Sequence, residues 1–228
     1  MTDQPEPSVR RLLADLHAYR VENMAPADLQ VNIDQRELLE RTADRSAFVK
    51  AGDVVEPFSL PEVDGGTVEL VQLLEHGPAV LLFFRFADCP ACNVALRHYQ
   101  AELHPPLAEL GATLVAISPQ VPDKLVTIKE RYDFGFPVAS DPDNGLARRF
   151  GITFVCSPES QEHMRSKGGD LSVELGTGKW ELPMPTVVVV GQDRVVALAD
   201  VAPDWMVRTE AATVIDAVRR LVAVPARG

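Results

Sequence analysis

Cysteine, aromatic residues and long apolar runs are all scarce in this chain of 228 residues. Its three cysteines, two of which form a Cys-x-x-Cys motif, are too few for the disulfide framework of a small secreted domain. No apolar run approaches the roughly 18 residues of a membrane span, so we expect no transmembrane helix. The first residues lack the basic and then apolar pattern of a signal peptide, which predicts a cytoplasmic protein with reduced thiols.

The chain also lacks an excess of positive charge, since 22 lysines and arginines stand against 33 aspartates and glutamates. The net charge of −11 repels nucleic acid and anionic membranes, so we expect neither as a partner. An apolar content of 46% is typical of a soluble globular protein with a substantial core. The simplest division is an N-terminal helical extension over residues 1–50, followed by one domain over residues 51–228.

The best-defined stretch is a buried strand followed by a helix that begins at a pair of cysteines. Residues 79–84 are apolar without alternation, which is typical of a central strand covered on both faces. Pro90 suits the first position of a helix, where its missing N–H costs nothing. Cys89 is then expected at the helix start, partly exposed, with Cys92 nearly one turn deeper on the same side.

Two cysteines at a helix start favour redox chemistry. The thiolate is the reactive form of cysteine, and the partial positive charge of a helix N-terminus stabilises it. Cys92 can then close a disulfide with Cys89. The alternatives are half of a structural zinc site or two inert core residues. No second Cys/His cluster supplies the remaining zinc ligands and no Gly-rich phosphate loop is present, so we expect no metal and no cofactor.

Apolar and helical segments alternate along the rest of the chain, which indicates β-α-β units and an α/β fold with a mostly parallel sheet. Further strands are expected over residues 112–118, 134–139, 185–190 and 195–199, and further helices over residues 123–132, 141–150 and 209–222. Residues 51–71 predict a β-hairpin, and residues 157–183 predict a long insertion loop with one helix. The helical extension either caps the domain or pairs two chains, so a homodimer is one expectation.

The strand, the Cys-x-x-Cys motif and the later segment Met184-Pro185-Thr186 together resemble the thioredoxin fold, a central mixed sheet flanked by helices. In that fold the proline before the last hairpin lies against the redox cysteines and follows a cis peptide bond. Pro185 matches this proline, which implies a supporting role for Pro185 and Thr186. The alternative is a trans proline that begins a strand.

Within the thioredoxin superfamily, the chain resembles the peroxiredoxin-like AhpC/TSA (alkyl hydroperoxide reductase/thiol-specific antioxidant) family. The resemblance spans about residues 51–222 and rests on segments in a fixed order: Gly52-Asp53, Pro57-Phe58-Ser59-Leu60, Gly77-Pro78-Ala79-Val80-Leu81, Phe84-Arg85, Val115-Ala116-Ile117-Ser118-Pro119-Gln120, Phe136-Pro137-Val138-Ala139-Ser140-Asp141 and Trp180-Glu181-Leu182-Pro183-Met184-Pro185. It implies a thiol-dependent peroxidase in which Cys89 attacks a hydroperoxide and Cys92 resolves the product as a disulfide. A thioredoxin- or glutathione-type reductant then restores the dithiol.

Three departures from the family pattern weaken the peroxidase interpretation. Phe86 stands three residues before Cys89, where typical members have Thr or Ser, and the proline earlier in that motif is missing. No arginine lies just before residues 187–190, where typical members keep one. Two alternatives therefore stay open, namely general dithiol–disulfide exchange with a disulfide substrate and a non-catalytic binding module on the same scaffold.

The side chains around the cysteines allow more than one role. Arg85 either stabilises the Cys89 thiolate or reaches solvent from the end of its strand. Asp88 is expected to cap the helix that follows. Cys156 is expected to be buried and inert, or to serve as another resolving thiol. The two tryptophans either pack in the core or shield the cysteines.

Overall fold

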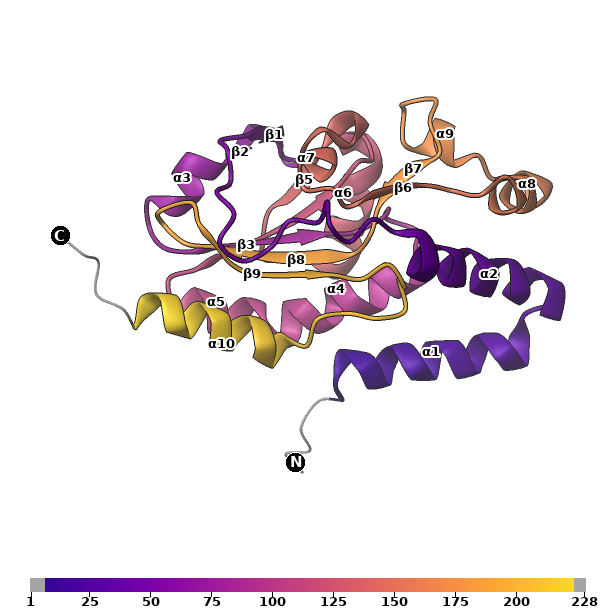
Figure 1. The fold of residues 1–228 in the computed structure, drawn as a ribbon, viewed down its shortest axis with the longest axis horizontal. Helices are drawn as coiled ribbons and strands as arrows, with labels where there is room; N and C mark the ends of the chain where they lie inside the picture. Colours follow the sequence, from indigo (N-terminus) through magenta and orange to yellow (C-terminus); the bar gives the residue numbers. More distant parts are fainter. Residues whose placement is uncertain (1–6, 224–228) are drawn as a thin grey trace.

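The computed structural model describes residues 7–223, and its centre is one mixed sheet of five strands in the order β5-β4-β3-β8-β9 (Figure 1). Four strands run in the same direction, namely β3 (Ala79–Phe83), β4 (Thr113–Ser118), β5 (Val138–Ser140) and β9 (Val196–Val201). The fifth, β8 (Thr186–Val190), lies between β3 and β9 and runs antiparallel to both. This topology confirms the predicted α/β fold with a central mixed sheet.

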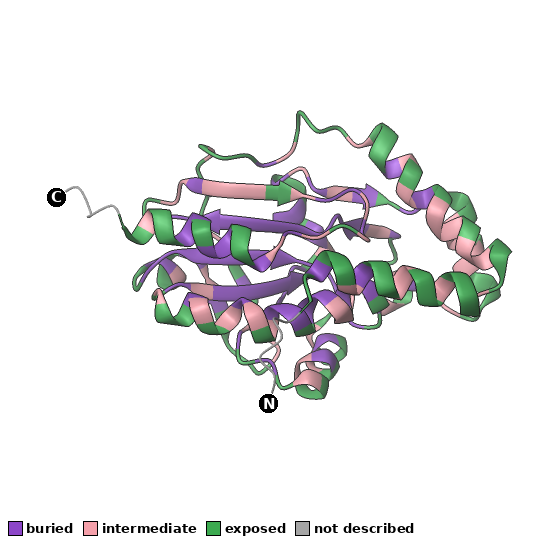
Figure 2. Ribbon diagram, turned by 90° about the horizontal axis from the view of Figure 1, so that it is seen from below, coloured by how far each residue is buried: buried purple, intermediate pink, exposed green. Residues whose placement is uncertain are grey.

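The middle strand β3 is buried on both faces, which explains why its sequence does not alternate between apolar and polar residues. Val80 and Leu82 pack into one hydrophobic cluster, and Leu81 and Phe83 into a second cluster on the opposite face. Figure 2 shows the buried sheet between helices whose outer sides are exposed.

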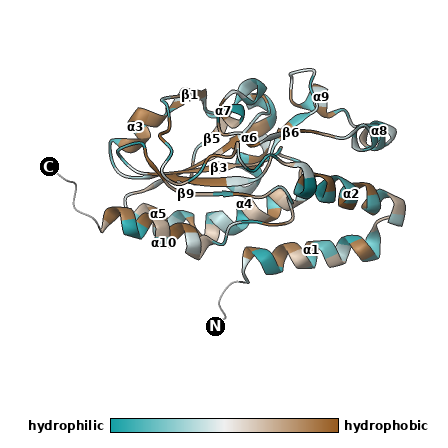
Figure 3. Cartoon of the chain, in the orientation of Figure 1, coloured by the Kyte–Doolittle hydropathy of each residue, from teal (hydrophilic) through white to brown (hydrophobic). Residues whose placement is uncertain are grey.

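Helices cover the sheet from both sides. The first cluster lies beneath α4 (Pro90–Glu102), α5 (His104–Glu109), α6 (Pro122–Tyr132) and α10 (Ala211–Val222), whereas α3 (Leu70–Leu74) and α7 (Gly145–Arg149) contribute to the second. Figure 3 shows apolar and polar residues on different sides of α10, as an amphipathic helix requires. None of the helices within residues 7–223 is long and apolar enough to cross a membrane.

The shorter strands and helices form where the local sequence favours them. The predicted hairpin is present as β1 (Ser59–Pro61) and β2 (Thr67–Glu69). A short 3-10 turn, η1 (Pro142–Asn144), precedes α7. The insertion predicted to be mainly loop is more ordered than expected. It contains α8 (Pro158–Ser166), α9 (Leu171–Glu174) and β7 (Glu181–Pro183), which pairs with β6 (Thr153–Val155). No residue of α8 is buried, so its sequence carries no apolar stripe that would reveal a helix.

The described part of the N-terminal extension forms a helical hairpin of α1 (Val9–Asn23) and α2 (Pro26–Thr42). In Figure 1 the hairpin lies at the end of the molecule where α8 also lies, and α2 contacts α8. The Arg36 guanidinium pairs with Asp204 at 3.1 Å. The Glu210 carboxylate accepts bonds from the first backbone N–H groups of α1. We propose that residues 1–50 are an extension to the domain over residues 51–228, and that its described part, residues 7–50, docks on that domain.

One buried hydrogen bond ties α4 to the segment before α10. The Tyr99 hydroxyl donates to the Thr209 carbonyl at 2.6 Å, and both residues are buried. Tyr99→Phe leaves that carbonyl without its partner, which should lower the free energy of unfolding by about 1–3 kcal/mol in urea denaturation. The matched change Tyr19→Phe, at a side chain exposed on α1, should leave stability nearly unchanged. Equal effects of the two variants would contradict this account.

Candidate active site

The cysteine pair lies where β3 ends and α4 begins. Cys89 occupies the N-cap position of α4 and Pro90 its first helical position, as the sequence predicted. The turn is held by Asn93, whose side-chain amide donates to the carbonyls of Ala87 (2.6 Å) and Cys89 (2.8 Å). Asp88 does not cap the helix, because its side chain points to solvent and lies 3.7 Å from Arg131. The expected capping role of Asp88 was therefore wrong.

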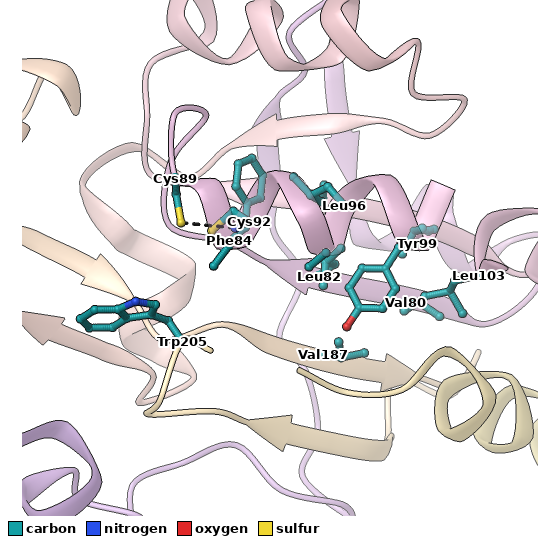
Figure 4. Packing of buried hydrophobic residues seen from close by; sticks show 14 of the residues in the cluster. Val80, Leu82, Phe84, Cys89, Cys92, Leu96, Tyr99, Leu103, Val187 and Trp205 are labelled. Carbon is teal, nitrogen blue, oxygen red and sulfur yellow. Dashed lines mark hydrogen bonds between the residues drawn. The ribbon is translucent and has the colours of Figure 1, made fainter. Parts of the chain in front are cut away.

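Two nitrogen donors converge on the Cys89 sulfur. The backbone N–H of Cys92 donates to Sγ at 3.3 Å, and Nη2 of Arg85 donates at 3.0 Å. Figure 4 shows the first of these bonds, with Cys92 directly behind Cys89 on α4. On the other side, Nη2 of Arg208 lies 3.8 Å from Sγ of Cys92. The sulfur pair thus lies between a helix start and two arginines.

Aromatic packing fixes the Arg85 guanidinium. Arg85 is buried, and its guanidinium carbon lies 4.1 Å from the ring centroid of Trp205. The Trp205 ring stacks in turn on Phe154, with centroids 6.4 Å apart. The Arg85 carbonyl accepts a bond from the Ser118 hydroxyl at the end of β4. Of the two readings of Arg85 from sequence, the structure shows contact with the thiol rather than with solvent.

The charges around the two sulfurs drive their pKa values apart. Burial by itself raises the pKa of Cys89. The hydrogen bond from Cys92 and the positive charges of Arg85 and Arg208 outweigh burial and hold that pKa well below its ordinary value. For Cys92, burial and the neighbouring Cys89 thiolate raise the pKa well above its ordinary value. Cys89 is therefore the sulfur that ionises first, and Cys92 stays a thiol beside it.

The expectation that Cys89 is partly exposed was wrong, since the exposed fractions of Cys89 and Cys92 are 0% and 1%. Local sequence shows that a cysteine begins a helix, but not what packs over it. Here the Arg85 side chain contacts the Cys89 sulfur and Trp205 packs on Arg85, and both residues come from outside α4. The two sulfurs still lie side by side, as disulfide formation requires.

Arg85 and Trp205 line one side of a cavity of about 230 Å³. Its walls come from α1, α2, α8, α9 and the β6–β7 segment, so the N-terminal extension and the insertion both contribute. The Cys156 side chain lines the cavity, and burial raises the pKa of its thiol to about 11. Cys156 is therefore a neutral thiol at physiological pH.

Pro185 and Thr186 lie at the start of β8, which pairs with β3. The expected cis bond before Pro185 was wrong, because no peptide bond within residues 7–223 is cis. Pro185 instead directly precedes β8 as a trans proline. Its carbonyl accepts a bond from the Ala202 N–H (2.9 Å), and its missing N–H is not needed there. Thr186 is paired in register with Phe83, and its hydroxyl donates to the Met184 carbonyl.

Sequence reasoning missed two contributors to the site. The sequence assigned no role to Arg208, and the structure places it beside Cys92. Gln120 was not considered, although its side-chain oxygen accepts a bond from the Ala87 N–H at 2.8 Å and so orders the turn before Cys89. Both residues are far from Cys89 in sequence, and only the fold of the sheet brings them to the end of β3.

Comparisons with known proteins give a consistent result. The sequence model of the AhpC/TSA family matches residues 51–199. A putative peroxiredoxin of Mycobacterium tuberculosis is 35% identical over 104 residues, which are 46% of this chain and 67% of the relative. Peroxiredoxin Bcp of Escherichia coli K12 is 34% identical over 108 residues, 46% of this chain and 65% of the relative. The aligned region thus spans about two thirds of each relative. The crystal structure of peroxidoxin BcpB from M. tuberculosis has a TM-score of 0.59 and 27% identity, covering 76% of this chain and 98% of that one.

The contact between Arg85 and Cys89 predicts a measurable change in thiol ionisation. Arg85→Met removes a positive charge that lowers the Cys89 pKa, so the pH at which the thiolate forms should move upward. The ultraviolet absorbance of the thiolate, taken as the difference from Cys89→Ser, follows this titration. Arg131→Met, at an exposed position, should titrate like the wild type. An unchanged midpoint in Arg85→Met would contradict the assigned contact.

The docked helical hairpin predicts limited access to Cys89. Arg36→Ala breaks the ion pair with Asp204, so the hairpin should open more often. Alkylation of Cys89 by iodoacetamide, followed by mass spectrometry, should then become roughly two- to fivefold faster. Arg41→Ala removes only a pair with Glu37 within α2 and should leave the rate unchanged. If both variants react like the wild type, the hairpin does not control access.

Proposed function

The chain belongs to the AhpC/TSA family, and we propose that it is a thiol-dependent peroxidase in which Cys89 reduces hydroperoxides. The observation that carries this proposal is the 3.0 Å contact between Arg85 and the Cys89 sulfur. It supplies the two things that peroxide reduction needs, a thiolate at neutral pH and a positive charge beside the reacting atoms.

In the first step, the Cys89 thiolate attacks one oxygen of the hydroperoxide. An S–O bond forms as the O–O bond breaks, giving a sulfenic acid on Cys89, and the second oxygen leaves as an alcohol or water after taking up a proton. Negative charge develops on the leaving oxygen. Arg85 is the nearest cation, and its Nε–H has no acceptor in the protein. Arg85 therefore takes over the charge stabilisation that typical members assign to residues missing here.

In the second step, the Cys92 thiol attacks the sulfenic sulfur, and water leaves as the Cys89–Cys92 disulfide forms. Cys92 starts as a thiol because burial raises its pKa and the neighbouring Cys89 thiolate raises it further. Once Cys89 is oxidised it no longer carries a negative charge. The positive charges of Arg208 and Arg85 then stabilise the Cys92 thiolate without that opposition. The Cys92 pKa then falls, so Cys92 becomes the nucleophile only after Cys89 has reacted.

Two further thiols must return the disulfide to the dithiol. We assign them to a thioredoxin- or glutathione-type reductant, in line with the family, and we place this cycle in the cytoplasm. Pro185 and Thr186 act as positioning residues, since β8 pairs with the strand that ends before the cysteines. Homodimer formation through the N-terminal helices stays a prediction. Exposed Tyr19 and Val21 on α1 are available for it.

General dithiol–disulfide exchange is the second candidate. The separated pKa values of Cys89 and Cys92 suit such exchange as well as they suit peroxide reduction. Burial of Cys89 favours the peroxidase, because a small peroxide reaches a buried sulfur more easily than a protein disulfide does. A non-catalytic module has no need of a thiolate held between two arginines.

The test uses limiting peroxide, with peroxide consumption and the protein's intact mass as readouts. The wild type should consume peroxide and lose two hydrogens as the disulfide forms. Cys89→Ser should lose nearly all consumption, and Cys92→Ser should gain one oxygen on Cys89 and stop after one turnover. Cys156→Ser is the matched control and should behave like the wild type. Equal peroxide consumption by the wild type and Cys89→Ser would contradict the proposal.

A further inference from the structure

The cavity in front of Arg85 is positively charged, although the chain as a whole carries a net charge of −11. The basic side chains that line it are Arg20, Arg85, His163 and Lys167, and none of the described lining residues is an aspartate or glutamate. Asp28 pairs with Lys167 at 2.9 Å and lies 3.8 Å from His163. Arg20 and Arg85 form no ion pair with a carboxylate among the described residues. The Cys89 sulfur contacts Arg85 and offsets its charge, whereas the Arg20 guanidinium has no paired counter-charge at the described part of the cavity.

Buried donors without acceptors add a second, independent observation. Nε of Arg85, Nε2 of Gln35 and Nε1 of Trp205 are buried and have no hydrogen-bond partner within residues 7–223. All three residues line this cavity, although they come from α2, the turn before α4 and the segment after β9. Unsatisfied buried donors are uncommon in folded proteins. All three groups are donors, so the missing partner is an acceptor.

The rest of the lining is apolar and largely aromatic. It includes Phe86, Phe154, Trp180 and Trp205, together with Met164, Leu171 and Leu182. A cavity of about 150 Å³ lined by such side chains holds a benzene ring. The volume of about 230 Å³ here leaves room for a six-membered ring and a small acceptor group.

We propose that this cavity binds an organic anion with a compact apolar body, in which a carboxylate group lies against Arg20, Gln35 and Arg85 while a ring or branched chain packs against the two tryptophans. The cationic lining and the donors favour the negatively charged group, and the aromatic walls favour the apolar body. The ligand would contact Arg85, whose guanidinium also binds the Cys89 sulfur. The proposal does not depend on peroxidase activity, since binding needs no reaction at sulfur.

The tryptophans provide a direct readout. The chain has only two, Trp180 and Trp205, and both line the cavity. Cyclohexanecarboxylate and cyclohexylmethanol share a ring, differ in charge and do not absorb where tryptophan does. Titrated into the full-length reduced protein, the carboxylate should change tryptophan fluorescence saturably, with a Kd at least about tenfold lower than that of the alcohol. Cys89→Ser should bind it too, which separates this proposal from the peroxidase mechanism.

Gln35→Glu tests the position of the negative charge. The variant keeps an oxygen that can accept the bond from the Ser157 N–H, now 2.6 Å long, but it replaces the unpaired donor by a carboxylate. It should raise the Kd of cyclohexanecarboxylate by about tenfold or more and leave that of the alcohol nearly unchanged. Gln72→Glu, the same change at an exposed residue of α3, should have no effect.

Three results would overturn the proposal. Equal affinities for the carboxylate and the alcohol would show that the cavity selects only for apolar shape. Binding of neither compound would show that it is closed to ligands of this size. Equal weakening by Gln35→Glu and Gln72→Glu would place the carboxylate elsewhere.

Discussion

The contact between the Arg85 guanidinium and the Cys89 sulfur is the interaction on which the chemistry of this protein depends. A thiol buried at the end of a sheet would ordinarily stay protonated, because burial disfavours its charged form. Here the helix start, Arg85 and Arg208 reverse that preference. Since Arg85 is itself buried, the thiolate in turn compensates a charge that would be costly to leave alone. Each charge therefore lowers the free-energy cost of burying the other.

The surroundings of this pair determine what can reach it. Trp205 stacks on Arg85, and the hairpin of α1 and α2 joins α8 in walling the cavity in front of both. The hairpin lies outside residues 51–199, the part of the chain that matches the family, whereas α8 lies within it. The matched part therefore supplies the reactive sulfur, and the hairpin contributes to the enclosure. The ion pair between Arg36 and Asp204 links the hairpin to the segment after β9.

The sequence correctly predicted the features that depend on local pattern. The uninterrupted apolar run of β3, the helix start at Cys89 and the hairpin of β8 and β9 were all predicted from spacing and composition. Burial of Cys89 was not, because it depends on Trp205 and on helices that meet the motif only in three dimensions. Arg208 and Gln120 were assigned no role for the same reason. The insertion was read as mainly loop because α8 lies on the surface and buries no residue of its own.

Pro185 shows a different limit. Its place before the last strand pair matched the thioredoxin pattern, yet the peptide bond before it is trans. The position of a proline in sequence therefore identified the strand but not the isomer. In this chain the space next to the redox centre is occupied by Arg85 and Trp205.

The most direct test of the central claim is the pH dependence of the rate at which hydrogen peroxide oxidises Cys89 in the wild-type protein. A thiolate that is already formed reacts at a rate that does not change as pH approaches the ordinary cysteine pKa of roughly 8.5. We predict that this oxidation rate does not change with pH from mildly acidic pH upward. A rate that climbs about tenfold per pH unit up to that ordinary value would show that Arg85 does not hold Cys89 as a thiolate.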